Sequence, residues 1–174
     1  MFSTKAEYGV RVMAHLARRE LDGQGGEHPI ALGTIAEAEG LPLAYLEHLV
    51  ARLRRSGLVE SRRGAHGGYS LGRPAQEITM AEVVEALEGE IAPIECITAD
   101  SDGALVCVRD GQPGHDPCPT KLLWTRVQGS IVRTLTDMTL ADLVEPAVKA
   151  GRKASAAALR PAATPHPNPE RATA

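Results

Sequence analysis

The stretch from residue 41 to residue 74, LPLAYLEHLVARLRRSGLVESRRGAHGGYSLGRP, decides the fold because its hydrophobic period changes part-way along. As far as Ser56-Gly57, apolar residues recur at the spacing of one helix face. These residues are Leu43, Leu46, Leu49, Val50 and Leu53. Beyond them, residues 58–61 and 69–71 resemble two short strands, and the arginine- and glycine-rich residues 62–68 join them. The stretch therefore predicts a helix followed by a β-hairpin.

Two further helices are predicted before this stretch and one after it. The first runs from Thr4 to about Arg19, where Thr4 and Glu7 have the spacing of a capping box. The second covers about residues 31–38 and ends at Gly40. A fourth helix is expected over about residues 80–87. This order predicts a mainly α fold with a small β-hairpin wing, a winged helix-turn-helix domain over residues 1–89.

The composition suits a globular protein that stays in the cytoplasm. Of the 174 residues, 43% are hydrophobic and 24% are charged. No apolar run approaches the roughly 20 residues that cross a bilayer, and the first residues do not resemble a secretory signal. We therefore expect no membrane partner.

The net charge of −3 hides a strongly basic region. Glu60 is the single acid between residues 52 and 73, a span that holds six arginines: Arg52, Arg54, Arg55, Arg62, Arg63 and Arg73. A local field of this kind attracts phosphate whatever the charge of the whole chain. The alternative is a solvated basic helix face with no partner.

Within a winged helix, the positions of these residues predict their roles on double-stranded DNA. The first residues of the recognition helix lie nearest the base edges, which makes Tyr45, Glu47 and His48 candidates for base contacts. Later arginines on the helix are placed for phosphates, and wing arginines can enter the minor groove. These arginines are Arg52, Arg54 and Arg55 on the helix and Arg62 and Arg63 on the wing. The alternatives are that Tyr45 packs on the core and that Glu47 pairs with a neighbouring arginine.

The rest of the chain divides into three segments. Residues 90–118 contain Pro, Gly and Asp throughout and no sustained period, so we expect a long functional loop there. Residues 119–150 are expected to form two helices, about 120–136 and 140–150. Residues 151–174 are rich in Ala and Pro and predict a disordered tail.

All three cysteines, Cys96, Cys107 and Cys118, fall in the expected loop, with ten residues between neighbours. Their odd number disfavours a disulfide framework. Thiolates are the usual ligands of iron–sulfur clusters, and the spacing is not that of a CxxC zinc site. A zinc site or a thiol redox switch remain as alternatives. An enzyme that uses Cys118 and His115 is disfavoured, because no orienting residue or oxyanion motif accompanies them, and we expect no enzymatic activity.

Three segments together resemble the IscR/NsrR family of bacterial transcription regulators, also called the Rrf-two family: TKAEYGVRVMAHLA (residues 4–17), residues 41–74, and ITMAEVVEALEG (residues 78–89). The resemblance covers about residues 1–146. It implies a winged helix with a long dimerisation helix, and a homodimer on a near-palindromic operator. It also implies base contacts by Glu47 and Arg63, with Tyr45 at another helix position used at the DNA.

The resemblance also implies an iron–sulfur cluster (2Fe-2S or 4Fe-4S) held by Cys96, Cys107 and Cys118, although the family's cysteines lie closer together in sequence. The position of the histidine ligand of one branch is occupied by Lys121, whereas Glu7 matches the carboxylate ligand of another branch. Glu7 is therefore the favoured fourth ligand, from the same subunit or its partner, with His115 and His15 as rivals. The alternative is that Glu7 only closes a capping box. The expected function is that of a cluster-controlled repressor for iron–sulfur assembly, iron, or a nitric-oxide or redox response.

Overall fold

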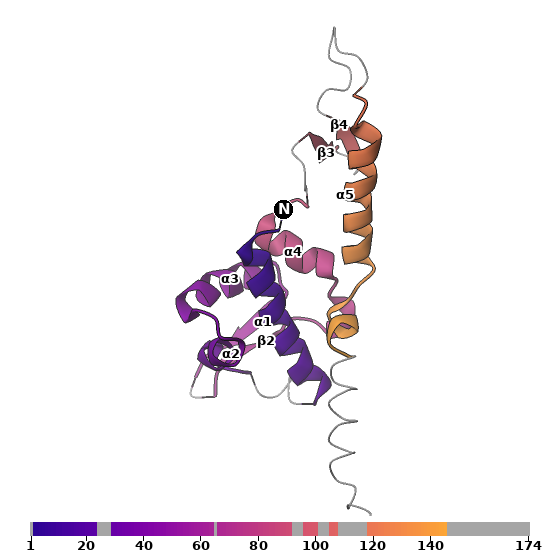
Figure 1. Cartoon of the computed structure of the whole chain (residues 1–174). Helices are drawn as coiled ribbons and strands as arrows, with labels where there is room; N and C mark the ends of the chain where they lie inside the picture. Colours follow the sequence, from indigo (N-terminus) through magenta and orange to yellow (C-terminus); the bar gives the residue numbers. More distant parts are fainter. Residues whose placement is uncertain are drawn as a thin grey trace, which may run out of the picture.

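The computed structural model describes residues 2–23, 29–64, 66–91, 96–100, 105–107 and 118–145. The elements of the body are α1 (Thr4–Leu21), α2 (Leu32–Glu39), α3 (Leu43–Arg55), β1 (Val59–Arg62), β2 (Gly68–Leu71), the 3-10 helix η1 (Ala75–Glu77) and α4 (Met80–Glu88). Three further elements follow: β3 (Ile97–Ala99), β4 (Leu105–Cys107) and α5 (Lys121–Thr136). In Figure 1, α1 to α4 and the β1-β2 hairpin form the body, while α5 extends beyond it with β3 and β4 beside its first turns.

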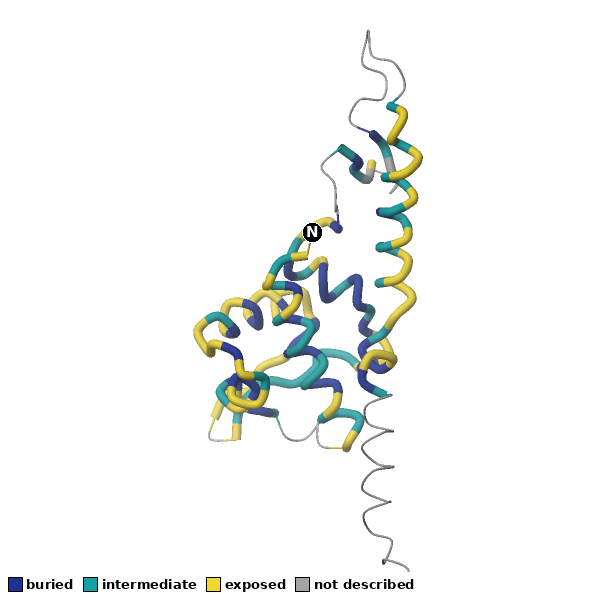
Figure 2. Tube along the Cα trace, viewed as in Figure 1, coloured by how far each residue is buried: buried dark blue, intermediate teal, exposed yellow. Residues whose placement is uncertain are grey.

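One core joins the helices of the body. The apolar sides of α1, α3 and α4 face one another. The side chains buried between them, each 0% exposed, include Met13, Leu46, Leu53 and Leu87. Figure 2 shows the buried side of each helix turned towards the others. Gly9 of α1 lets α4 approach closely, because a Cβ built at Gly9 would lie 2.0 Å from Leu87 Cδ1. The helix-turn-helix and hairpin expected from the sequence are confirmed.

The wing is a short antiparallel hairpin fixed at its base by a third segment. β1 and β2 pair from Val59↔Leu71 to Arg62↔Gly68. Ile30, just before α2, adds an isolated bridge to β2 with hydrogen bonds Ile30 N to Tyr69 O of 3.0 Å and Tyr69 N to Ile30 O of 2.8 Å. At Gly68 a Cβ would lie 2.4 Å from Ile30 O, so only glycine allows this approach. The hairpin is thereby connected to the α1–α2 part of the body.

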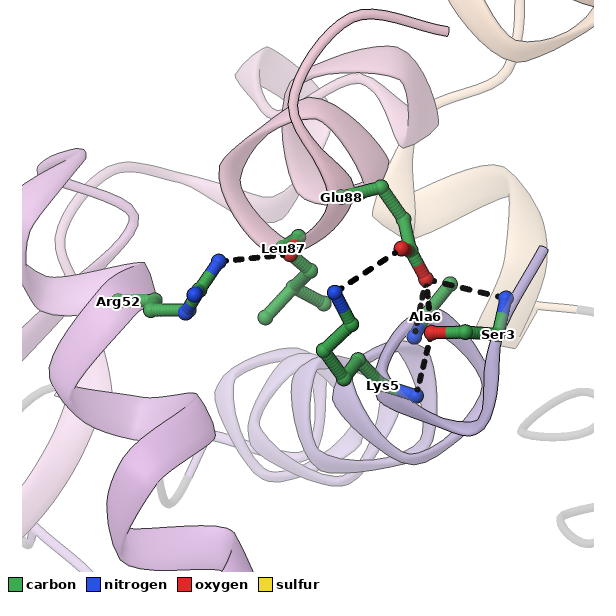
Figure 3. Close-up of polar contacts among 6 residues, drawn as sticks. All are labelled: Ser3, Lys5, Ala6, Arg52, Leu87 and Glu88. Atoms are coloured by element: carbon green, nitrogen blue, oxygen red, sulfur yellow. Dashed lines mark hydrogen bonds and ion pairs between the residues drawn. The ribbon is translucent and has the colours of Figure 1, made fainter. Parts of the chain in front are cut away.

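The start of α1 is capped differently from the expected Thr4–Glu7 box, and that expectation is wrong. Ser3 is the N-cap, and its Oγ accepts from Lys5 N at 3.1 Å. The carboxylate that completes the cap comes from Glu88 at the end of α4: Oε1 accepts from Ser3 N at 3.1 Å, from Ala6 N at 3.3 Å, and from Ser3 Oγ. Figure 3 shows these bonds and the Lys5 ion pair, in which Nζ lies 3.3 Å from Glu88 Oε2. Glu88, a residue distant in sequence, thus completes the N-terminal cap of α1.

Replacing Glu88 by alanine is expected to lower the free energy of unfolding by about 1–2 kcal/mol, the usual cost of losing a helix cap. Burial raises the pKa of Glu88, but the bonds from Ser3 and the Lys5 pair outweigh burial and hold that pKa below its ordinary value of 4.5. Because the pKa of Glu88 is lower in the folded than in the unfolded protein, its ionised carboxylate stabilises the folded state above the unfolded pKa of 4.5. This stabilisation is lost as pH falls from 4.5 through the folded pKa. Chemical denaturation across this range should show a weaker acid destabilisation in the variant. Glu85→Ala, an exposed change on the same helix, is the control; an equal loss there would contradict the cap.

The segment after α5 returns to the body. Thr139 forms a backbone bridge with Thr79, and both residues begin helices with the same cap: Thr79 with Glu82, and Thr139 with Asp142. Residues 140–145 are helical, and Leu140, Ala141 and Val144 are buried in the main core. The expected unit 119–150 is therefore not wholly separate from the winged-helix domain, because its second helix packs there. The expected helix end at residues 146–150 and the tail 151–174 lie outside the described residues.

The thiol segment, residues 90–118, contains regular structure that its sequence does not predict. β3 and β4 pair antiparallel, with Ile97 opposite Cys107 and Ala99 opposite Leu105. Ile97 is 0% exposed and Cys107 is 4% exposed. The expectation of an irregular loop over all of residues 90–118 is wrong for these strands, which are too short to create a visible period. Among the described residues, no helix has the length and apolar character needed to cross a membrane.

Candidate nucleic-acid interface and thiol site

The outer face of α3 is a row of exposed side chains. Leu46, Leu49, Val50 and Leu53 are buried, so the opposite side of the helix faces solvent. The exposed row contains Ala44, Glu47, His48, Ala51 and Arg55. Their spacing of three or four residues places them on one helix face. The candidates Glu47 and His48 are thus presented together, as base contact by a recognition helix requires.

Tyr45 lies at the edge of this face. Its ring packs partly against the core and meets Tyr8 of α1 edge to face, with centroids 5.8 Å apart. Tyr45 therefore packs partly on the core in this structure, as the alternative interpretation of the sequence predicts. A contact between its half-exposed part and DNA stays a prediction.

The arginines of α3 are partly engaged within the protein. Arg52 Nη1 donates to Leu87 O at 3.0 Å, which connects α3 to the end of α4 (Figure 3). Arg54 Nη1 donates to Ser61 Oγ of β1 at 3.2 Å, and Arg55 Nε donates to Ala51 O at 3.3 Å. All three residues are nevertheless exposed. Each guanidinium has several donors, so these contacts orient it and leave N–H groups for phosphate.

The wing carries the two remaining candidates. Arg62 ends β1, and Arg63 follows it; both are exposed. Gly64 then has φ 115°, a conformation that side chains disfavour. The turn therefore begins directly after the arginines and places them at the free end of the hairpin.

Lys5 is a basic residue near the interface that sequence reasoning missed. A shallow hollow of about 420 Å³ is lined by Lys5 together with His48, Arg52, Arg55 and Tyr45. Lys5 belongs to α1, and only the packing of α1 against α3 brings it there. No local pattern in the sequence could have indicated this position.

The described parts of the thiol segment bring the cysteines towards one end of α5. Cys96 precedes Ile97, whose partner across the hairpin is Cys107, so these two cysteines share one end of the β3-β4 hairpin. Both strands contact α5, and Cys118 lies three residues before this helix begins, with its Sγ 3.3 Å from Thr120 Oγ1. In the described residues no group of three or more His, Cys, Asp or Glu side chains already surrounds a metal position.

The candidates for a fourth ligand differ in their availability. Glu7 is exposed near the start of α1, and its carboxylate has no partner among the described residues. His15 Nδ1 lies within hydrogen-bonding distance of Glu39 Oε1, at 3.1 Å. The other oxygen of the same carboxylate accepts from Arg11 Nε. His115 lies outside the described residues. The capping alternative for Glu7 is wrong, because Glu88 completes that cap.

Comparison with known proteins identifies the family. The model of the family described as "Rrf2: Iron-dependent Transcriptional regulator" matches residues 2–146. The chain belongs to the Rrf2 family. It is a DNA-binding transcription regulator and not an enzyme.

Two proteins and one solved structure illustrate what this Rrf2-family chain is similar to. The protein rrf2 of Nitratidesulfovibrio vulgaris is 35% identical over 83% of this chain and 87% of its own length. The regulator CymR of Bacillus subtilis is 37% identical over 81% of this chain and 87% of its own length. The solved structure of T. potens IscR has a TM-score of 0.65 and 37% identity, covering 86% of this chain and 90% of that chain. These likenesses confirm the resemblance seen in the sequence and the winged-helix fold.

Proposed function

We propose that this Rrf2-family regulator acts as a homodimer on a near-palindromic operator and represses from it under control of an iron–sulfur cluster. The cluster ligands are Cys96, Cys107 and Cys118. The observation that carries the proposal is the pairing Ile97↔Cys107, which gathers two thiols at one end of a hairpin packed on α5. The third thiol, that of Cys118, lies three residues before α5 begins.

The donor chemistry fits such a cluster. Cys107 lies in β4, while Cys96 and Cys118 precede β3 and α5, and these three elements contact one another. Thiolate sulfur is the ligand that iron–sulfur clusters use most. Glu7, from the same subunit or its partner, is the proposed fourth ligand, because its carboxylate is exposed and unpaired among the described residues. When bound, the cluster supplies a centre whose loss or oxidation changes how the thiol segment is held.

The exposed side of α5 supports the dimer. Leu122 is 64% exposed and Leu123 is 55% exposed, and Figure 2 shows exposed and half-buried residues along the length of this helix. Adjacent exposed leucines on a helix that extends from the body favour contact with a second copy. A change in the thiol segment would then act on α5, and so on the spacing of the two recognition helices.

Anaerobic purification tests the cluster. We expect a brown protein with matching iron and sulfide contents, and an affinity for a duplex selected from a random-sequence pool that changes when the cluster is removed. Colourless protein that cannot be reconstituted would reject the cluster. Oxidant-dependent or zinc-dependent DNA binding by that protein would then assign the cysteines to a thiol switch or a zinc site.

Arg63→Ala is expected to weaken binding to the selected duplex about tenfold, the usual worth of one good base or groove contact. Its melting temperature should not change, because Arg63 is exposed and its side chain makes no hydrogen bond or ion pair with another described residue. Fluorescence anisotropy titration at fixed salt measures the affinity. Arg18→Ala removes the same charge from an exposed position of α1 and serves as the control. Equal affinities of the Arg63 variant and the wild type would remove the wing from the interface.

A further inference from the structure

A second hollow lies between the C-terminal half of α1 and the base of the wing. Its volume is about 310 Å³, which is within the range of small-molecule sites. Arg19 and Glu20 of α1 line one side, and Tyr69 and Ser70 of β2 line another. None of these residues belongs to the DNA interface or the thiol site described above.

Glu20 is incompletely satisfied in this hollow. Its Oε1 accepts from Ala75 N at 3.3 Å, whereas its buried Oε2 has no hydrogen-bond partner among the described residues. A buried acceptor without a donor costs free energy that a paired one does not. The terminal torsion of a glutamate is soft, so a small rotation can present this carboxylate to a donor in the hollow.

The hollow also offers an unpaired cation. Arg73, which also lines the hollow, donates to Glu82 Oε1 at 2.7 Å and to Glu77 O at 3.5 Å. In contrast, the side chain of Arg19 makes no hydrogen bond or ion pair with another described residue. Arg19 and Glu20 are adjacent in sequence and both line the hollow, so they offer it opposite charges. The carboxylate of Glu60 in β1 also lines the hollow. The buried side chains of Leu16 and Ile30 provide apolar surface between the helix and the wing.

We propose that this hollow binds a small zwitterion of amino-acid size. The ammonium group donates to the Glu20 carboxylate, the carboxylate of the ligand accepts from the Arg19 guanidinium, and the carbon atoms of the ligand contact Leu16 and Ile30. A ligand with only one of the two charges would leave one of these partners unsatisfied.

The position of the hollow gives such a ligand an effect on DNA binding. Tyr69 and Ser70 belong to β2, and the same hairpin ends in the pair Arg62↔Gly68 next to the wing arginine Arg63. A ligand between α1 and β2 therefore contacts both the body and the element that carries the wing. If the hairpin changes position when the protein binds DNA, bound ligand changes the affinity for DNA. Bound DNA then changes the affinity for the ligand by the same factor.

Isothermal titration of the full chain tests the site, with each proteinogenic L-amino acid added singly at millimolar concentration. We expect saturable binding of at least one amino acid, and roughly tenfold or greater weakening for its methyl ester and for its N-acetyl derivative. Glu20→Gln keeps an acceptor for Ala75 N and removes the charge; Arg19→Ala removes the cation. Each should weaken binding by a similar factor, and Arg18→Ala should not.

The melting temperature of each variant shows that it is folded. Failure of every amino acid to bind the folded wild type would overturn the proposal. Binding that neither Glu20→Gln nor Arg19→Ala weakens would also overturn it, as would equal binding of the ester or the N-acetyl form. None of these measurements depends on iron, so they stand or fall separately from the cluster.

Discussion

Gly9→Ala is expected to lower the free energy of unfolding by about 2–3 kcal/mol, although alanine is the better helix former by about 1 kcal/mol. The added Cβ would lie 2.0 Å from Leu87 Cδ1 and 3.2 Å from its Cγ. Leu87 is 0% exposed and cannot rotate into open space. Relief therefore requires Leu87 to repack within the core or α1 and α4 to separate, and these two helices pack more extensively than any other described pair of helices. Chemical denaturation measures the loss.

Gly33→Ala is the matched control. Gly33 is the second residue of α2, and a Cβ built there meets nothing within 4 Å. The same substitution should therefore be neutral or stabilise the protein by up to about 1 kcal/mol. Adding Leu87→Ala to Gly9→Ala should cost less than the sum of the two single changes, since it removes the atoms that clash. Equal effects at Gly9 and Gly33 would contradict the close approach of α1 and α4.

The order of elements in the body could be predicted because each depends on local sequence. The change of period at Ser56-Gly57 separates α3 from β1, and Gly40 ends α2 in the left-handed conformation with φ 64°. The helical spacing of Leu46, Leu49, Val50 and Leu53 identified the buried side of α3, and so its exposed side. The exposed candidates Glu47 and His48 followed from the same pattern.

Features that depend on residues distant in sequence could not be predicted. The cap of α1 requires Glu88, 85 residues after Ser3, and the spacing of Thr4 and Glu7 suggested a local alternative. Tyr45 has the position of a DNA contact, but Tyr8 of another helix takes up part of its surface. The pairing of Ile97 with Cys107 requires a closed loop, and three-residue strands are too short to be recognised from alternation.

Cys107→Ala is expected to abolish cluster loading, with iron and sulfide falling from the wild-type content to background. Cys107 is the buried cysteine and lies within β4, so its thiol has a fixed position next to Ile97 of the neighbouring strand. Its replacement leaves too few thiolates to hold a cluster of this class. Anaerobic reconstitution followed by an absorbance spectrum and iron and sulfide assays measures the loss.

The same substitution also removes buried volume, so loss of structure must be separated from loss of a ligand. Val106→Ala is a matched control because it shortens the preceding, half-buried residue of the same strand and keeps every thiol. We expect Val106→Ala to load normally. Melting temperatures of both apo-proteins within about 5 °C of the wild type would show that the hairpin survives, since truncating one small side chain costs about 1 kcal/mol. Normal loading of Cys107→Ala would show that another residue is the ligand. If both variants fail to load, the hairpin's packing on α5, and not the Cys107 thiolate alone, is what cluster assembly requires.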